Sequence, residues 1–437
     1  MNSPFVNESA ADFSSAADQK KMKTALKAVR QKLSCRYPLV IGGEKIETDS
    51  VISSVNPSKP SEVVGYAAMA NTEYASQAIE AAGKAFPDWR DTDFHQRVEF
   101  LLRSAEKMRQ RRFELAALEV LEIGKNWREA DADVTEAIDY LEYYGREMLR
   151  LGEPRSMGKY PGETNEYSYQ PRGVGVVISP WNFPLAIPTG MASAAIVAGN
   201  TVILKPASQS PVIAAWLVDI LLDAGIPDGV INYLPGPGEK VGEFLVKSPL
   251  IHFIAFTGSK EVGLKINRFA GDTLEGQKAV KKVIMEMGGK NAIIIDSDAG
   301  LDEAVSGTVQ SAFGYQGQKC SACSRAIALE DVYDIFLERL VVSAKSLRIG
   351  SAEELDNFMG PLISEEALRK VERYVEIGKS EGRLVLGGEG IETEEGGYFF
   401  GPTIFADVPP EATIAQEEIF GPVLSVIKAK NLSEALT

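Results

Sequence analysis

The 437-residue sequence has very little histidine: only His95 and His252. Histidine is the commonest metal ligand and the usual base in Ser-His and Cys-His hydrolases. A zinc site or such a hydrolase would need one of these two residues, so we predict no metal site. Any catalytic chemistry has to rest on other side chains.

Cysteine is also scarce, and long apolar runs are absent. The three cysteines, Cys35, Cys320 and Cys323, argue against a disulfide framework and suit a reducing compartment. No apolar run approaches the roughly 20 residues that span a bilayer. The polar stretch 1–33 contains no apolar segment typical of a secretory signal. We therefore expect a soluble cytoplasmic protein without a membrane partner.

Positive charge is outweighed by negative charge. The chain has 46 basic and 61 acidic residues and a net charge of −15, which would repel nucleic acid. The acidic residues are scattered, which is typical of a solvated surface and not of an acidic tail. Hydrophobic residues (45%) and charged residues (24%) match a globular protein. At about 150 residues per domain, the length predicts two or three domains.

The first part of the chain is predicted to be helical. Val98, Leu101, Leu102, Ala105 and Met108 recur at helical spacing, with Arg97, Glu99, Arg103 and Glu106 on the opposite side. A second amphipathic stretch covers 134–149. The following segment, 152–172, is polar and rich in glycine and proline, and we predict an extended arm there.

From Gly173 onward, short apolar strands alternate with helices. The predicted strands are 174–178, 201–204, 231–234 and 251–256. Ser210 and Pro211 start a helix that Gly225 ends. This order predicts a parallel sheet covered by helices, a fold class that binds nucleotides at the carboxyl ends of its strands.

A second α/β pattern starts at strand 292–295, continues through helix 332–347 and reaches strand 423–427. We therefore predict an α/β protein with a dinucleotide-binding domain (1–151 and 173–286), an oligomerisation arm (152–172) and a catalytic domain (287–437). The chain stops at Thr437 directly after a strand and a helix start, which is an unusual end for a domain.

Four motifs are candidates for chemistry, and each also has a structural interpretation. Cys320, between small and polar residues, could be an exposed nucleophile, a buried structural thiol, or half of a thioredoxin-like pair with Cys323. Glu286 follows an apolar strand and precedes two glycines. Burial would raise its pKa and make it a usable base, whereas exposure would leave it an ordinary strand-end acid.

The third motif, 179–184, follows a strand and opens a helix. Its Asn182 could donate to an oxyanion, or the motif could be only a proline-rich turn with a packed Trp181. The fourth comprises dinucleotide candidates at strand ends, which are the cation Lys205, the glycine loop 236–242, and Gly258-Ser259 at a helix start. None of these motifs is decisive alone.

Their order and spacing resemble the aldehyde dehydrogenase superfamily from about residue 40 to the end. The strings Pro-Trp-Asn-Phe-Pro (180–184), Glu-Met-Gly-Gly-Lys (286–290) and Gly-Gln-x-Cys (317–320) carry this resemblance, together with Glu418-Ile-Phe-Gly-Pro (418–422). Within that superfamily, 312–325 is similar to the 1-pyrroline-5-carboxylate (glutamate-γ-semialdehyde) dehydrogenases. The N-terminal extension and 136–144 also fit that branch.

The resemblance implies a Rossmann-like domain followed by a catalytic domain, and oxidation of L-glutamate γ-semialdehyde to glutamate in proline degradation. It implies Cys320 as nucleophile, Asn182 as oxyanion donor and Glu286 as the base that activates water. Glu136 and Ser321 would meet the polar end of the substrate. The cofactor NAD would be contacted by residues on both halves of the chain, which are Ser179, Trp181, Lys205, Ser208, Gly238, Gly242, Gly258, Ser259, Gly263, Glu418 and Phe420.

Two departures from the family pattern matter. Many members have glutamate at the position of Ser208, where it binds the adenosine ribose and repels a 2′-phosphate. Serine removes that repulsion, so we expect NADP to be accepted beside NAD. Family members also continue well beyond Thr437, through a substrate-anchoring loop and an oligomerisation strand. We therefore expect a C-terminally truncated fold, with a homo-oligomer for a full-length form.

Two other functions stay open at this point. The chain could be a dehydrogenase for a different aldehyde, or a truncated homologue that binds a dinucleotide without turnover. The observation that would decide most is the geometry around Cys320, where Asn182 and Glu286 should converge on the sulfur.

Overall fold

The computed structural model describes residues 4–437 and divides into two compact units. Unit 1 contains the described residues up to Ser54, together with Val63–Leu118 and Ala130–Met287. Unit 2 contains Val55–Glu62, Glu119–Glu129 and Gly288–Thr437. The short segments 55–62 and 119–129, which we assigned to the first domain, thus pack with unit 2.

Unit 1 is built on a seven-stranded sheet with the order β12-β11-β8-β9-β10-β2-β3. Five of its strands are parallel: β8 (Val174–Ile178), β9 (Thr201–Lys205), β10 (Ile231–Tyr233), β11 (Phe253–Gly258) and β12 (Lys282–Met287). The hairpin of β2 (Leu39–Ile41) and β3 (Glu44–Ile46) extends the sheet in antiparallel pairing. The apolar strand segments predicted from 174 to 256 are all found.

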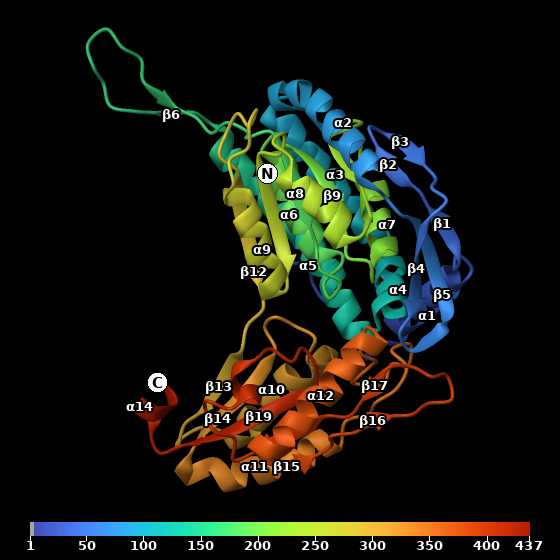
Figure 1. The fold of residues 1–437 in the computed structure, drawn as a ribbon, viewed down its shortest axis with the longest axis vertical. Coiled ribbons are helices and arrows are strands. Elements are labelled where there is room, and N and C mark those ends of the chain that lie inside the picture. The colour runs from blue at the N-terminus through green and yellow to red at the C-terminus, as the bar shows by residue number, and fades with distance from the viewer. Residues whose placement is uncertain (1–3) are drawn as a thin grey trace. The chain divides into compact units, whose positions relative to one another are not determined.

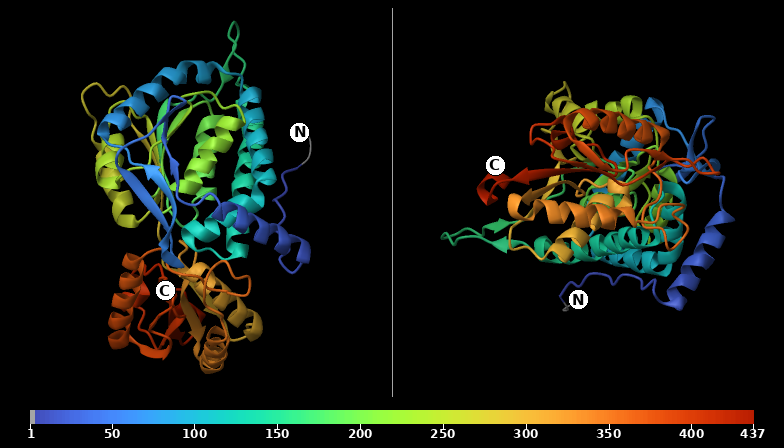
Figure 2. Two further views of the ribbon diagram at one scale, coloured as in Figure 1. Left: turned by 90° about the vertical axis from the view of Figure 1, so that its right-hand side faces the viewer. Right: turned by 90° about the horizontal axis from the view of Figure 1, so that it is seen from below.

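Helices cover both faces of this sheet (Figures 1 and 2). One core contains buried side chains of α2 (Thr72–Asp91), α8 (Glu243–Lys247) and α9 (Lys260–Gly271) against the strands. The connecting helices α6 (Ala186–Val197) and α7 (Pro211–Asp223) also pack on the sheet, and α3 (Phe94–Gln110) packs on both of them. The chain places β9 and β10 on one side of β8, then β11 and β12 on the other, so the strand order reverses between β8 and β11.

The region before α2 contains more strands than the sequence predicted. After α1 (Ala16–Arg30), residues 35–68 form β2, β3 and a three-stranded sheet of β1 (Cys35–Tyr37), β5 (Lys59–Ala68) and β4 (Val51–Asn56). The N-terminal region is therefore helical only in part, and its strands were not predicted. These strands are short or carry irregular burial patterns, so they lack a clean period-2 alternation.

The predicted helices at 98–108 and 134–149 are confirmed as parts of α3 and α5 (Trp127–Gly152), with α4 (Arg112–Ile123) between them. Arg97 was assigned to the solvent side of α3, and this was wrong. It is only 6% exposed, and its guanidinium donates to carbonyl groups that include those of Val197 and Thr92. A buried arginine can satisfy several backbone acceptors at once, and helical spacing alone does not reveal such partners.

Residues 152–172 form the predicted arm. Its strands β6 (Arg155–Ser156) and β7 (Glu166–Tyr167) pair antiparallel, and their residues are exposed. The hairpin projects from the rest of unit 1 in every view (Figures 1 and 2). Its predicted role in oligomerisation stays a prediction.

Unit 2 has a five-stranded sheet with the order β13-β14-β19-β18-β15. The strands β13 (Asn291–Ile295), β14 (Cys323–Leu329), β19 (Val423–Ala429) and β18 (Thr403–Ala406) are parallel, and β15 (Arg383–Leu386) is antiparallel. A small hairpin of β16 (Gly390–Ile391) and β17 (Phe399–Phe400) lies outside this sheet.

Two buried clusters form the core of unit 2. One packs α10 (Leu301–Phe313) and α11 (Glu330–Lys345) on the sheet, and the other contains α12 (Glu365–Glu381) and α13 (Thr413–Gln416). The last helix is α14 (Leu432–Ala435). Among residues 4–437, no helix is both long enough and apolar enough to cross a membrane.

Candidate active site

The predicted cofactor residues of unit 1 gather at one edge of its sheet. Ser179 follows the end of β8, Lys205 ends β9, the glycine loop 236–242 follows β10, Gly258 ends β11 and Glu286 lies one residue before the end of β12. Because these five strands are parallel, their carboxyl ends meet at the same edge. This is the edge at which open α/β sheets bind ligands, close to the point where strand order reverses.

Asn182 lies in the turn between β8 and α6. It is 5% exposed, and Trp181 beside it is partly exposed. The turn is fixed from α5, where the Asp133 carboxylate accepts a hydrogen bond from the Ala186 N–H at the start of α6 (2.9 Å). The N-cap residue of α6 supplies no side-chain bond itself, so a distant carboxylate caps this helix. Asp133 was not predicted from the sequence.

Lys205 is a buried amine at the end of β9. Its side chain is 5% exposed, and burial lowers the pKa of the ammonium group to about 8. Its Nζ donates to the Pro206 carbonyl (3.0 Å), and within residues 4–437 it forms no ion pair. A desolvated amine of this kind fits a ligand that brings hydroxyl or phosphate oxygens, so the site is compatible with a dinucleotide. Ser208, in the next turn, is exposed.

The glycine loop after β10 is a helical turn, Gly238–Gly242, that leads into α8. Gly238 is exposed, and a Cβ there would have open space around it. A Cβ on Gly242 would lie 3.4 Å from the Lys205 Cε. The loop and the buried amine are therefore neighbours, and a larger residue at 242 would crowd the lysine.

The residues after β11 differ in their roles. Ser259 is exposed and caps α9, accepting from the Val262 N–H (3.4 Å). Gly263 is buried, and a Cβ there would come within 2.6 Å of the Met287 Sδ. Gly263 thus permits close packing of α9 against β12. Gly258 is partly exposed and lies at the sheet edge itself.

Glu286 lies on the edge strand β12, where alternate residues are exposed, and its side chain is among the exposed ones. Of the two positions that the sequence left open for Glu286, buried or exposed, the structure shows the exposed one. Glu136, on α5, is partly buried and accepts a hydrogen bond from the Tyr140 hydroxyl (3.2 Å). Burial, and then the nearby Glu136 carboxylate, raise the pKa of Tyr140. The hydroxyl thus stays protonated as a donor.

In unit 2 the two neighbouring cysteines have different environments. Cys320 lies in a turn ahead of β14 and is partly exposed, whereas Cys323, the first residue of β14, is 3% exposed. The Cys323 thiol contacts the Arg325 carbonyl (3.3 Å), and burial raises its pKa to about 11. No disulfide joins any of the three cysteines, which all lie in the described region. Ser321, next to Cys320, is exposed.

Asn291, which was not among the predicted site residues, holds the turn that carries Cys320. Its Nδ2 donates to the carbonyl of Cys320 (2.6 Å) and to the carbonyl of Ala322 (3.2 Å). Because Asn291 starts β13, the turn is tied to the amino end of a strand. The signal was available: an amide side chain directly follows the Gly-Gly-Lys string.

The Glu418 carboxylate lies against Gly288 and Gly289, just before β13. Its Oε1 accepts from the Gly289 N–H (3.2 Å), and a Cβ on Gly288 would collide with its carboxylate. Phe420 has a positive φ of 61° and is partly exposed. Glu418, Phe420 and Gly289 line a hollow of about 20 Å³. Its other lining residues include Lys319, Cys323 and Ser324.

We call residues 314–322 the nucleophile loop. Its residues Tyr315 (φ 49°), Gln316 (φ 58°) and Gly317 (φ 68°) are all left-handed. For non-glycine residues this conformation costs on the order of 1–3 kcal/mol each and needs support from the surrounding structure.

Side chains supply that support. Those of the loop reach the segments 119–129 and 360–363, which both belong to unit 2. The Tyr315 hydroxyl donates to the Ile123 carbonyl (3.3 Å), and Gln316 donates to the Pro361 carbonyl (2.7 Å) and accepts from the Gly360 N–H (2.9 Å). Gln318 accepts from the Ile363 N–H (2.9 Å), and Lys319 forms an ion pair with Glu129 (2.5 Å). None of these bonds was predicted from the sequence.

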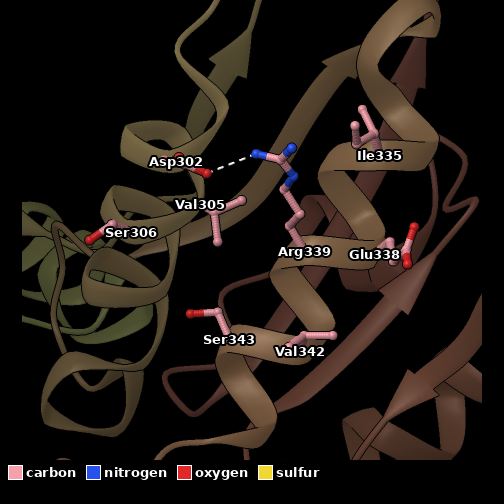
Figure 3. A pocket seen from close by; sticks show the side chains of 8 residues that line it. All are labelled: Asp302, Val305, Ser306, Ile335, Glu338, Arg339, Val342 and Ser343. Carbon is pink, nitrogen blue, oxygen red and sulfur yellow. Dashed lines mark hydrogen bonds and ion pairs between the residues drawn. The ribbon is translucent and has the colours of Figure 1, made fainter.

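A larger hollow of unit 2 lies elsewhere. It has a volume of about 560 Å³ between α10 and α11, where Arg339 reaches Asp302 (2.8 Å, Figure 3). Its lining includes exposed apolar side chains of Ile335 and Val342 but none of the predicted site residues. We therefore do not take it as the active site. Within residues 4–437, no group of three His, Cys, Asp or Glu side chains could hold a metal ion.

The predicted site residues thus form two groups. Asn182, Glu286 and most cofactor candidates lie in unit 1, whereas Cys320, Ser321, Glu418 and Phe420 lie in unit 2. The convergence of Asn182 and Glu286 on the Cys320 sulfur joins residues of both units, and it stays a prediction.

Comparison with known proteins decides the family. The model of the aldehyde dehydrogenase family matches residues 44–437. The chain belongs to the aldehyde dehydrogenase family. A 1-pyrroline-5-carboxylate dehydrogenase of Anoxybacillus flavithermus is 50% identical, with 100% of this chain and 84% of that protein covered. A protein of the same name from Bacillus subtilis is 48% identical, with the same coverage.

The structural comparison agrees. The crystal structure of 1-pyrroline-5-carboxylate dehydrogenase from Thermus with bound NAD matches with a TM-score of 0.98 and 51% identity. The match covers 100% of this chain and 84% of the Thermus chain. The predicted family, the α/β aldehyde dehydrogenase fold and the resemblance to the 1-pyrroline-5-carboxylate dehydrogenase branch are confirmed.

Proposed function

We propose that the protein oxidises L-glutamate γ-semialdehyde, the open form of 1-pyrroline-5-carboxylate, to L-glutamate with NAD, as a step of proline degradation. Relatives about half identical over the whole chain carry the name of that enzyme. The observation that carries the mechanism is the contrast between the thiols of Cys320 and Cys323, because Cys320 is partly exposed whereas Cys323 is buried.

Cys320 attacks the aldehyde carbon as a thiolate and forms a hemithioacetal. The side-chain amide of Asn182 and the backbone N–H of Cys320 donate to its oxyanion. Loss of hydride from the same carbon leaves a thioester on the sulfur. Glu286 then takes a proton from water, the water attacks the thioester, and the carboxylic acid leaves as the thiol re-forms.

NAD, when bound, supplies the hydride acceptor. We assign its binding to the carboxyl edge of the unit 1 sheet, through Ser179, Trp181, Lys205, Ser208, Gly238, Gly242, Gly258 and Ser259, with Gly263 behind them and Glu418 and Phe420 from unit 2. The buried amine of Lys205 supports this assignment, because ribose hydroxyls would satisfy its remaining donors.

We assign the polar end of the substrate to Glu136 and Ser321. A carboxylate suits the α-ammonium group, and an exposed hydroxyl suits the α-carboxylate. We further propose a reducing location such as the cytoplasm, because the mechanism needs Cys320 as a thiol. We propose a homo-oligomer in which the exposed hairpin β6–β7 takes part.

The test is NADH formation by the purified chain, followed by absorbance. Glutamate γ-semialdehyde should be oxidised with much higher kcat/KM than succinate semialdehyde or propanal, which lack the α-amino group. Cys320→Ser should abolish turnover, whereas Cys35→Ser, at an exposed cysteine on β1, should not. Equal efficiency with all aldehydes would favour a different substrate. Absence of turnover with every aldehyde would favour a dinucleotide-binding protein without activity.

A further inference from the structure

The turn ahead of Cys320 is held in a conformation that its residue types disfavour. Tyr315 and Gln316 are consecutive non-glycine residues with positive φ, and both are at most 1% exposed. Left-handed non-glycine residues persist only where neighbouring groups over-determine them, and they cluster at functional sites. The neighbouring groups here can be identified.

Gln316 uses both ends of its side-chain amide. Its Nε2 donates to the Pro361 carbonyl (2.7 Å), and its Oε1 accepts from the Gly360 N–H (2.9 Å). These bonds join the nucleophile loop to a second backbone segment at two points, so they fix both the position and the direction of the turn. A Cβ on Gly360 would also lie 2.5 Å from the Gly124 carbonyl oxygen, so the receiving segment is itself tightly packed.

We propose that Gln316 is a positioning residue for the reaction: its amide clamps the left-handed turn to residues 360–361 and thereby sets the location of the Cys320 sulfur. The side chain acts through the backbone and does not touch the reacting atoms. The inference rests on the proposed function in one respect, because it takes Cys320 as the nucleophile.

The first test is Gln316→Ala. Displacement of a reacting group by about 1 Å can lower turnover about 100-fold, so we expect kcat to fall by at least tenfold in folded protein. Gln416→Ala is the matched control. That glutamine is also in unit 2 and also donates to a proline carbonyl, that of Pro410 (2.6 Å), but it is exposed and outside the loop. A kcat of Gln316→Ala within twofold of the wild type would overturn the proposal.

Gln316→Gly separates the clamp from the backbone conformation. Glycine adopts positive φ without strain, but this substitution removes both hydrogen bonds of the Gln316 side chain. If the clamp positions the thiol, the glycine variant should lose about as much turnover as the alanine variant. If glycine restores turnover, the left-handed conformation alone is sufficient and the proposal is wrong.

Gln316→Glu supplies a pH signature that general destabilisation does not give. A protonated carboxyl group can donate to Pro361 and accept from Gly360, whereas the carboxylate can only accept. The ratio of its kcat to that of the wild type should therefore rise as the pH falls. A ratio independent of pH would count against the clamp.

Hydrogen exchange tests the clamp without any turnover. In Gln316→Ala, the backbone amide hydrogens of residues 314–322 and of Gly360 should exchange at least tenfold faster than in the wild type. Exchange in the rest of unit 2 should not change. If the wild type oxidises no aldehyde, the proposed function is wrong. The exchange measurement still tests whether the Gln316 side chain holds the nucleophile loop in place. Unchanged exchange in both segments would overturn it.

Discussion

The main sheets of the two units carry their candidate site residues at opposite ends of their strands. In unit 1, the site residues follow the carboxyl ends of five parallel strands. In unit 2, Cys320, Gly289 and Glu418 precede the amino ends of β14, β13 and β19. The first arrangement follows from topology, because any parallel sheet gathers its carboxyl ends. The second depends on individual side-chain bonds that hold irregular segments in place.

The contrast suggests different responses to mutation. The unit 1 edge is a scaffold whose residues act separately, so the effect of one substitution there should depend little on the others. The nucleophile loop of unit 2 is a network, so changes in it should be coupled. Substitutions at the two sites test this difference.

Asn182→Ala should lower kcat about 100- to 1,000-fold, because it removes an oxyanion donor. Thermal unfolding should change little. Asn232→Ala is the contrasting control: this buried amide bonds to the backbone of Gly42 and Gly229 and should lower the melting temperature while the folded fraction keeps its turnover. Full activity of Asn182→Ala would show that the oxyanion donor is another group.

Lys205→Met should weaken NAD binding, measured by fluorescence titration, and change the pH dependence of stability. The folded-state pKa of about 8 lies below the ordinary 10.5, so the folded form binds fewer protons between these values. Wild-type stability should therefore rise from pH 8 to 10.5. Below pH 8, burial of the charge costs a few kcal/mol, because the pKa lies about 2.5 below its ordinary value and one pKa unit corresponds to about 1.4 kcal/mol.

Lys205→Met should lack that rise and be more stable than the wild type at pH 7, as measured by denaturant unfolding. Lys205→Arg retains a charge that does not titrate in this range and serves as the control. Parallel stability curves for the wild type and Lys205→Met would show that the amine is not desolvated in solution.

Ser208→Glu should reduce kcat/KM with NADP by about tenfold or more and leave the value with NAD within about threefold. The added carboxylate would repel the 2′-phosphate, in line with the Coulomb energy of two charges near a protein surface. Ser208→Gln adds similar bulk without charge. A wild-type enzyme that already rejects NADP would contradict the prediction.

Cys323→Ser should leave turnover of the folded protein within about threefold, although a buried hydroxyl in place of the thiol lowers stability. A thioredoxin-like mechanism would instead require both thiols. Loss of activity in this variant, without loss of Cys320 alkylation by iodoacetamide, would favour that alternative.

The carboxyl edge of the unit 1 sheet could be predicted from the sequence because each part of it depends on neighbouring residues in the chain. Each strand is a short apolar run, and each site residue stands directly after one, so parallel pairing alone places Lys205 and Gly258 at the same edge. The nucleophile loop could not be predicted in the same way. The partners of Gln316 and Lys319 are 44 or more positions away in sequence, and no pattern near Cys320 indicates them.

The same limit explains one error and one question that the sequence left open. The acceptors of Arg97 include the carbonyl of Val197, which is 100 residues away, so its burial was invisible to helical periodicity. The exposure of Glu286 follows from its place on the edge strand β12, and strand order is a property of the whole sheet.

The Lys319–Glu129 ion pair has a consequence for biosynthesis. Residues 119–129 leave the ribosome 190 positions before Lys319, yet they pack with the late part of the chain. At about 5–20 residues per second, this segment waits roughly 10–40 s for its partners. A chaperone that shields 119–129 during this interval should increase the yield of folded protein, whereas early collapse of the segment onto the nascent sheet should decrease it.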